Sequence, residues 1–274
     1  MVLTRSRYSS EPLGGLRGSS RNQLAKVLRA SGETIKPATA AKALDQSRID
    51  VARLLARWAK QGWLQRVRRG IYVAVPIESE RADSAPEDAW VIAEAAFSPC
   101  FISGWSAAEH WSLTEQVFRS VCVSTARKPR VRKQKLGGTE FALRTVPQKQ
   151  FFGLKTVWRG RTRVQVTDPS RTIVDLFSDP SLGGGLRSSM DMLENYLRAK
   201  DQADLKLVLK YADRLSNRAV FKRLGFLLQR IAPEQKNIIE ACAERLSAGY
   251  TKLDPQLASA RLATEWRLWL PAGW

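Results

Sequence analysis

The stretch QSRIDVARLLARWAKQGWLQRVRRGIYVAV, residues 46–75, decides how the first part of this chain folds. Its first half carries four apolar side chains at positions i, i+3, i+4 and i+7: Val51, Leu54, Leu55 and Trp58. This spacing is typical of an amphipathic helix with one buried face. Ser47 can cap the start of the helix and Gly62 can end it. The sequence therefore predicts a helix between these two residues.

The second half of the stretch favours two short strands. The segments GWLQRVRR and GIYVAV meet near Arg69 and Gly70, and apolar residues in both can face a core. Upstream, residues 19–32 and 34–45 predict two further helices. Three helices followed by a two-stranded wing describe a winged helix-turn-helix, which we predict for residues 19–75.

Arginines on this helix and hairpin require an explanation, because burying an unpaired arginine costs free energy. A helix of this length fits a DNA major groove about 12 Å wide. We expect Arg48, near the helix start, to reach a base edge, and the hairpin to contact phosphates or the minor groove. The predicted DNA-binding residues are Ser47, Arg48, Arg53, Arg57, Arg66, Arg68 and Arg69. The alternative is a protein-interaction module, since small basic helical domains also bind proteins.

The net charge supports a polyanionic partner. The chain of 274 residues has 45 Lys and Arg against 26 Asp and Glu, a formal net charge of +19 and a pI near 10.4. Two segments carry this excess: residues 1–75 hold 15 basic and 4 acidic side chains, and residues 119–163 hold 13 basic and 1 acidic. Such a distribution indicates two basic surfaces that attract nucleic acid. The alternative is a basic coat that only keeps the protein soluble.

A second domain follows a predicted linker, PIESERADSAPED, at residues 76–88. We predict α+β for the whole chain, with a larger α+β domain at residues 87–274, a mainly antiparallel sheet and C-terminal helices. A helix with Asp168 as its cap and Pro169 at its first position is predicted to end at Phe177. Strands are predicted at residues 100–103, 117–125, 140–146, 151–158 and 161–167, and helices across residues 186–247. The first 18 residues read as a tail, and the final apolar run, 261–274, as a strand or a docked segment.

Three blocks of this second part resemble one known family. They are FISGWSAAEHWSLTEQ at 101–116, VTDPSRTIVDLF at 166–177 and NRAVFKRLGFLLQ at 217–229, placed behind RRGIYVA at 68–74. In this order and spacing they resemble the AbiEi family of antitoxins, which belong to type IV (AbiE-like) toxin–antitoxin and abortive-infection systems. The resemblance extends from Ser19 to about Arg230.

The resemblance implies an antitoxin with two roles. Its winged helix would bind inverted repeats in double-stranded DNA of its own promoter and repress the operon, and its C-terminal domain would counteract an AbiEii-like nucleotidyltransferase toxin. The alternative is an antitoxin that acts by direct protein–protein contact with the toxin, with DNA binding incidental.

A second run of basic residues lies within residues 127–135. It comprises Arg127, Lys128, Arg130, Arg132, Lys133 and Lys135. No aromatic residue interrupts the run, which favours a sequence-independent contact with phosphates over base stacking. We expect it to extend the DNA contact or to meet RNA that the toxin uses. The alternative is a solvated loop between two strands.

Catalytic chemistry has weak support in this sequence. His110 is the only histidine, and one pair with Ser106 does not make a hydrolase. A metal-dependent nuclease needs converging carboxylates, and the available ones are Glu140, Asp168, Asp175 and Asp179. GGGLRSS lacks the lysine of a phosphate-binding loop. We predict no enzyme activity, no catalytic residue, no metal and no cofactor.

Cysteine use and hydropathy indicate the compartment. Cys100, Cys122 and Cys242 fit neither a disulfide framework nor a zinc site, so we expect reduced, mostly buried thiols. No apolar run approaches the roughly 20 residues that cross a bilayer, and the N-terminus has no apolar signal region. We predict a cytoplasmic protein without a membrane partner.

Overall fold

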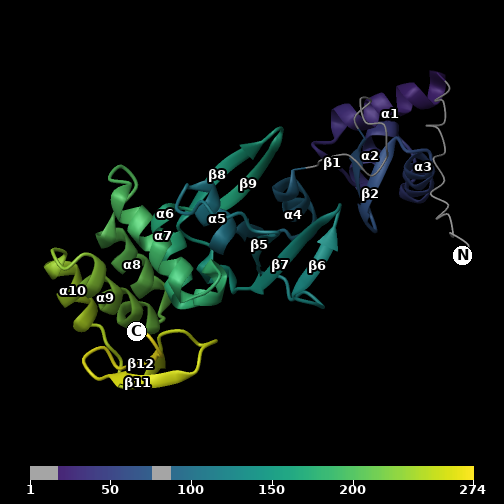
Figure 1. The fold of residues 1–274 in the computed structure, drawn as a ribbon. Helices are drawn as coiled ribbons and strands as arrows, with labels where there is room; N and C mark the ends of the chain where they lie inside the picture. Colours follow the sequence, from purple (N-terminus) through teal and green to yellow (C-terminus); the bar gives the residue numbers. More distant parts are fainter. Residues whose placement is uncertain (1–17, 76–87) are drawn as a thin grey trace, which may run out of the picture. The chain divides into compact units, whose positions relative to one another are not determined.

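The computed structural model describes residues 18–75 and 88–274 (Figure 1). Residues 1–17 of the predicted tail and residues 76–87 of the predicted linker lie outside the described residues. The chain divides into two compact units. The described residues up to Ala96, together with 136–138 and 159–162, form the first, and the remainder of 97–274 forms the second.

The first unit begins with three helices and a small sheet. The helices are α1 (Gly18–Ala30), α2 (Pro37–Leu44) and α3 (Arg48–Lys60). The strands are β1 (Thr34–Ile35), β2 (Leu64–Arg68) and β3 (Ile71–Ala74). They pair antiparallel in the order β1-β3-β2. The three predicted helices and the predicted hairpin are therefore present, and β1 is an addition that the sequence did not indicate.

A continuous apolar core holds these elements together. Val51, Leu55 and Trp58 of the predicted stripe are almost fully buried, whereas Leu54 is half-buried. They pack with side chains from all the other elements: Leu24, Val27, Ile35, Ala40, Leu64 and Tyr72. Between β2 and β3 the two-residue turn needs a positive φ, which Gly70 supplies at 79°. Local sequence and core packing thus agree on one arrangement.

The second unit contains a six-stranded sheet. Its strands are β4 (Cys100–Ile102), β5 (Ser120–Thr125), β6 (Lys133–Leu136), β7 (Thr139–Thr145), β8 (Leu154–Arg159) and β9 (Thr162–Thr167). They lie in the order β6-β7-β5-β4-β9-β8. β4 and β5 are antiparallel, but β5 pairs with β7, and β4 with β9, in parallel. The expected mainly antiparallel sheet is thus a mixed one, because the chain passes through β6, which was not predicted, before it returns as β7.

Helices and a second small sheet complete the chain. The helices are α4 (Ala89–Phe97), α5 (Gly104–His110), α6 (Pro169–Ser178), α7 (Leu186–Arg198), α8 (Leu205–Leu215), α9 (Ala219–Ile231) and α10 (Lys236–Ala243), with 3₁₀ turns η1 (Gln148–Gln150) and η2 (Pro180–Gly183). The final strands are β10 (Thr251–Lys252), β11 (Ser259–Ala263) and β12 (Leu268–Pro271). They form a sheet in the order β10-β12-β11, so the final apolar run does return as strands. The α+β class is confirmed.

Helix α6 lies at the centre of the second unit. All its residues from Pro169 to Phe177 are buried, the polar ones included. Asp168 caps it as predicted, because its Oδ1 accepts a hydrogen bond from the backbone N–H of Arg171 at 2.8 Å. Arg223 of α9 donates to the carbonyls of Phe177 at the end of α6 and of Leu253 after β10 (2.7 and 3.0 Å). These bonds join the helices to the terminal sheet.

The described helices were compared by their length and apolar character. None of them combines the length and the apolar character needed to cross a bilayer.

Candidate nucleic-acid interface

The start of α3 is fixed by the side chain of Ser47. Its Oγ accepts a hydrogen bond from the backbone N–H of Asp50 at 3.1 Å and donates one to Asp50 Oδ2 at 2.6 Å. The turn before it contains Asp45 in a left-handed conformation, with φ of 51°. Ser47 therefore has a structural role as the N-cap, and its hydroxyl is already engaged on both sides.

The three predicted arginines of α3 are exposed but do not share one stripe. At about 100° per residue, Arg53 and Arg57 lie about 40° apart, whereas Arg48 lies about 140° from Arg53. All three side chains are exposed, and Arg53 Nη1 lies 3.5 Å from Asp50 Oδ1. Arg53 and Arg57 therefore share one exposed face of α3, whereas Arg48 projects from the first turn in nearly the opposite direction from Arg57.

Two further residues of this face were not among the predicted DNA-binding residues, although the sequence places Lys60 off the apolar stripe. Lys60 follows Arg53 and Arg57 at helical spacing and is exposed. Ile49 is 67% exposed, although it is a large apolar side chain. Its position four residues before Arg53 would have placed it on the polar face, and this spacing is the signal that could have found it.

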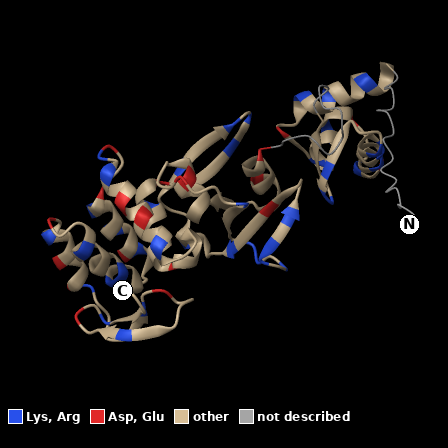
Figure 2. Cartoon of the chain, in the orientation of Figure 1, with Lys and Arg blue, Asp and Glu red and all other residues tan. Residues whose placement is uncertain are grey.

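The hairpin β2–β3 presents its arginines away from the core. Val67 is buried, whereas Arg66 and Arg69 are exposed and Arg68 is half-buried. The register shifts between Arg66 and Arg68, which marks a β-bulge near the tip of the hairpin. Figure 2 shows Lys and Arg on α1, α3 and β2 of this unit. Within residues 18–75 the acidic side chains are Glu33, Asp45 and Asp50.

The second basic run is partly a strand. Arg127, Lys128 and Arg130 lie in the irregular segment that follows β5, and Arg132 immediately precedes β6. Lys133 and Lys135 belong to β6, which forms an edge of the six-stranded sheet. All six basic side chains are exposed. The alternative of a plain loop is therefore wrong for residues 133–135, and the run is anchored to the sheet.

Two cavities lie along β7 beside this run. One, of about 440 Å³, is lined by Arg132, Arg144 and Asp179, among others. The other, of about 330 Å³, is lined by Lys133, Lys135 and Glu140, among others. Trp105 and Ala142 border both cavities. Neither Trp105 nor Arg144 was among the site residues predicted from the sequence.

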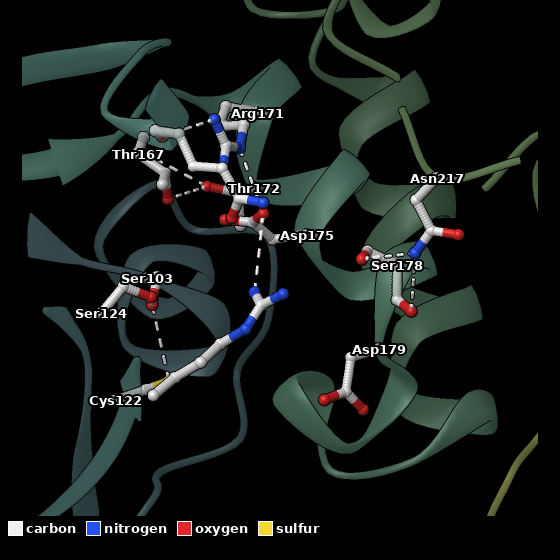
Figure 3. A network of polar contacts seen from close by, with 12 residues as sticks. Ser103, Cys122, Ser124, Thr167, Arg171, Thr172, Asp175, Ser178, Asp179 and Asn217 are labelled. Carbon is white, nitrogen blue, oxygen red and sulfur yellow. Dashed lines mark hydrogen bonds and ion pairs between the residues drawn. The ribbon is translucent and has the colours of Figure 1, made fainter. Parts of the chain in front are cut away.

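Polar side chains of the three sequence blocks that carry the family resemblance make hydrogen bonds inside the second unit (Figure 3). Arg171 Nε donates to Asp175 Oδ1 at 3.1 Å, and its Nη1 donates to the carbonyl of Phe152 at 3.0 Å. Ser103 Oγ lies 2.8 Å from Ser124 Oγ, and Asn217 Nδ2 donates to Ser178 Oγ at 2.9 Å. The blocks therefore supply bonds that hold the second unit together.

Three of the four carboxylates considered for a nuclease, namely Asp168, Asp175 and Asp179, have structural partners. Asp168 Oδ2 accepts a hydrogen bond from the Tyr211 hydroxyl at 2.8 Å, and Asp179 caps η2 through Ser181. Asp175 pairs with Arg171. Over residues 18–75 and 88–274, no group of three or more His, Cys, Asp or Glu residues could hold a metal ion.

Ser106 and His110 also have roles in packing. Ser106 Oγ accepts a hydrogen bond from the backbone N–H of Cys122 at 2.9 Å, and the His110 ring meets Trp111 edge-on at 4.5 Å. The indole N–H of Trp111 donates to the carbonyl of Thr167 at 2.6 Å. The serine hydroxyl thus supports β5 as a buried structural group.

The cysteines are free and buried, as expected from the sequence. Burial raises the pKa of the Cys122 thiol to about 12, and burial likewise raises the pKa of Cys242 to about 12. Burial, followed by its hydrogen bond to Asp168, raises the pKa of Tyr211 to about 12. All three groups therefore stay protonated at neutral pH.

Comparisons with known proteins identify a similar fold. No family model matches the sequence, and no curated protein matches it. Among solved structures, the chain is similar to the crystal structure of the RV2827C protein from Mycobacterium tuberculosis, with a TM-score of 0.61 and 12% sequence identity. The similarity covers 94% of each chain. It shows that the α+β architecture also occurs in that protein.

Proposed function

We propose that this protein is a DNA-binding antitoxin that represses its own operon and counteracts a nucleotidyltransferase toxin. In this proposal residues 19–75 act as a winged helix-turn-helix, with α3 in the major groove and the hairpin β2–β3 against the flanking backbone. The observation that carries the DNA-binding part is the exposure of Arg53 and Arg57 on the outer face of α3 together with Arg66 and Arg69 on the adjacent hairpin.

The charge and shape of this module favour DNA over a protein partner. Arginine can bind guanine O6 and N7 through two hydrogen bonds, and an exposed Ile49 can contact a thymine methyl group. In this proposal Arg48, which is exposed in the first turn of α3, contacts a base edge or a phosphate. The antitoxin part of the proposal rests on the sequence resemblance to the AbiEi family.

DNA titrations with single-residue variants test the DNA-binding part. Arg53→Ala should weaken binding to the DNA upstream of the gene by about 1–3 kcal/mol and relax the preference at one base pair. Arg66→Ala should weaken binding to all DNA sequences alike. It should also lower the slope of log affinity against log salt concentration by about one unit. Fluorescence anisotropy between roughly 50 and 200 mM salt measures both effects.

The control for this test is Arg187→Ala, which removes an exposed arginine from α7. It should leave the DNA affinity unchanged. If Arg53→Ala, Arg48→Ala and Arg66→Ala all bound DNA as tightly as the unchanged protein, the proposed DNA surface would be wrong.

The alternative proposal is an antitoxin that neutralises its toxin by direct contact, with DNA binding incidental. Co-expression with the nucleotidyltransferase toxin encoded beside the gene separates the two. Growth rescue by a protein that carries Arg53→Ala and Arg66→Ala, together with co-elution of the toxin, would favour contact. Rescue lost together with DNA binding would favour repression.

A further inference from the structure

A groove lies along β7 of the six-stranded sheet, and the proposed DNA contact of residues 19–75 does not use it. In the pairing of β5 with β7, Cys122 lies opposite Ala142, and Ser124 lies opposite Arg144. α5 and η2 pack together next to β5. The two cavities of about 440 and 330 Å³ lie along β7 and share Trp105 and Ala142. These volumes fall within the range of sites for small ligands.

Arg144 lines the larger cavity with unused hydrogen-bond donors. Its Nη1 lies 3.9 Å from Asp175 Oδ1, which is beyond hydrogen-bond distance, and Arg171 Nε occupies the same oxygen at 3.1 Å. Among the described residues this weak ion pair is the only ion pair or hydrogen bond of the Arg144 guanidinium, and the side chain is 26% exposed. A planar guanidinium with free N–H groups binds phosphate oxygens well.

The walls of the groove add positive charge. Arg132 borders the same cavity as Arg144, and its backbone is held to β7, because the N–H of Leu143 donates to its carbonyl at 2.7 Å. Lys133 and Lys135 line the adjoining cavity. The acidic side chains of the lining are Glu140 and Asp179. Asp179 is already engaged, because its Oδ1 accepts a hydrogen bond from Ser181 Oγ at 2.6 Å.

Trp105 provides a fixed aromatic wall between the two cavities. Its ring stacks on Phe118 with centroids 5.5 Å apart, and its indole N–H donates to the carbonyl of Ser120 at 2.6 Å. These two contacts determine the orientation of the ring before any ligand arrives. An aromatic side chain beside cations is the combination that binds an unpaired base together with its phosphate.

We propose that this groove binds a nucleoside phosphate, with the phosphate at Arg144 and Arg132 and the base against Trp105. The nucleoside phosphate is either a free ribonucleotide or the terminal residue of a single strand, because both present the same groups. A duplex does not fit this chemistry, since its bases are paired and stacked. The site is independent of the DNA-binding proposal for residues 19–75.

Calorimetric titration of the full chain tests the proposal. The probes are the four ribonucleoside triphosphates and a 5′-phosphorylated hexaribonucleotide. Binding should saturate, and Arg144→Gln should weaken it about tenfold, because a charge-assisted pair of hydrogen bonds is lost. Arg144→Lys keeps the charge and should give an intermediate loss. Binding by the triphosphates would identify a free nucleotide, and binding by the hexaribonucleotide alone would identify a strand end.

The matched control is Arg163→Gln. Arg163 is an exposed arginine in β9 whose guanidinium lies 4.8 Å from the Trp158 ring centroid. This change should leave nucleotide affinity within about twofold, as expected for a distant surface charge. If Arg144→Gln does not fold, the double variant Arg132→Gln, Lys135→Gln tests the proposal in its place, because both side chains are exposed. It too should bind the nucleotide more weakly than the unchanged protein. The proposal fails if no probe binds at millimolar concentration, if Arg163→Gln weakens binding as much as the groove variants do, or if duplex DNA displaces the probe.

Discussion

Asp175 is a buried carboxylate with two arginine side chains as neighbours. Its side chain is 1% exposed, and it faces Arg171 at 3.1 Å and Arg144 at 3.9 Å. Asp175 Oδ2 has no hydrogen-bond partner among the described residues. An internal ion pair of this kind stabilises the fold only while the opposite charges remain matched.

Replacing this carboxylate should therefore be costly. Asp175→Asn should lower the free energy of unfolding by about 3–5 kcal/mol, because it leaves buried Arg171 without its counter-charge. Urea denaturation followed by circular dichroism measures the change. The control is Asp213→Asn. The Asp213 side chain is 43% exposed, so loss of its ion pairs to Arg218 and Arg245 should lower the free energy of unfolding by at most about 1 kcal/mol. Equal losses in the two variants would contradict this account.

Capping residues were predictable from the sequence, but the partners of buried charges were not. Ser47 and Asp168 bond to backbone groups three residues away, so their roles follow from local order. Asp175 appeared in the sequence only as one of four carboxylates available to a nuclease. Its contact with Arg144 joins residues 31 positions apart in the sequence, and only the folded sheet brings them together.

Helix α9 packs against the terminal sheet at a glycine, where the helix has no side chain. Gly225 lies in the middle of α9, and a Cβ built on it would overlap the indole ring of Trp266. The indole N–H of Trp266 donates to Gln229 Oε1 at 2.7 Å, which fixes the ring over the helix. Close approach of the ring and the helix backbone therefore depends on this glycine.

Adding a methyl group at this contact should separate the two elements. Gly225→Ala should lower the free energy of unfolding by about 3 kcal/mol, since the strain exceeds the gain in helix propensity. Thermal unfolding should also show a lower transition temperature. The matched control is Gly249→Ala, where an added Cβ meets nothing within 4 Å, and the change should stay within about 0.5 kcal/mol. A stable Gly225→Ala protein would mean that Trp266 can move aside at little cost.

Strands with apolar residues were predicted, and polar ones were missed. The hairpin β2–β3 was found because Leu64, Val67 and Ile71 mark a buried face. β6 reads KQKL, and its only apolar residue is Leu136, so periodicity could not identify it. β1 is two residues long and pairs with β3, which is far away in the sequence. The groove along β7 was missed for the same reason, because β6 forms one side of it.

Buried thiols give the molecule as a whole a sensitivity to high pH. An exposed thiol titrates near pH 8.5, whereas burial raises the pKa of Cys122 and of Cys242 to about 12. Between these values the unfolded chain loses protons that the folded chain keeps. Stability should therefore fall as pH rises through this window, by at most about 1.4 kcal/mol per pH unit for each thiol.

Denaturation at several pH values from about 8 to 11 measures this slope. The double variant Cys122→Ala, Cys242→Ala removes both groups, and its slope should be flatter than that of the unchanged protein. Cys100 remains in both proteins, so the difference reports on the two thiols alone. Identical slopes would mean that these thiols are accessible to water in the folded protein.

Composition and pattern predicted the α+β class and the clustering of positive charge in two segments, because both are properties of the sequence itself. The order of strands in the six-stranded sheet and the central position of α6 could not be predicted, since they depend on contacts between residues far apart in the chain. The winged helix, the operator and the toxin stay predictions.

The lysines of β6 also bear on how copies of the protein meet. β6 ends the sheet, so its outer backbone groups are available to a strand from another molecule. Lys133 and Lys135 are exposed on this edge, and an incoming strand would have to remove water from both ammonium groups. The same charges that make the groove cationic therefore oppose edge-to-edge association, which protects a chain with an open sheet from aggregation.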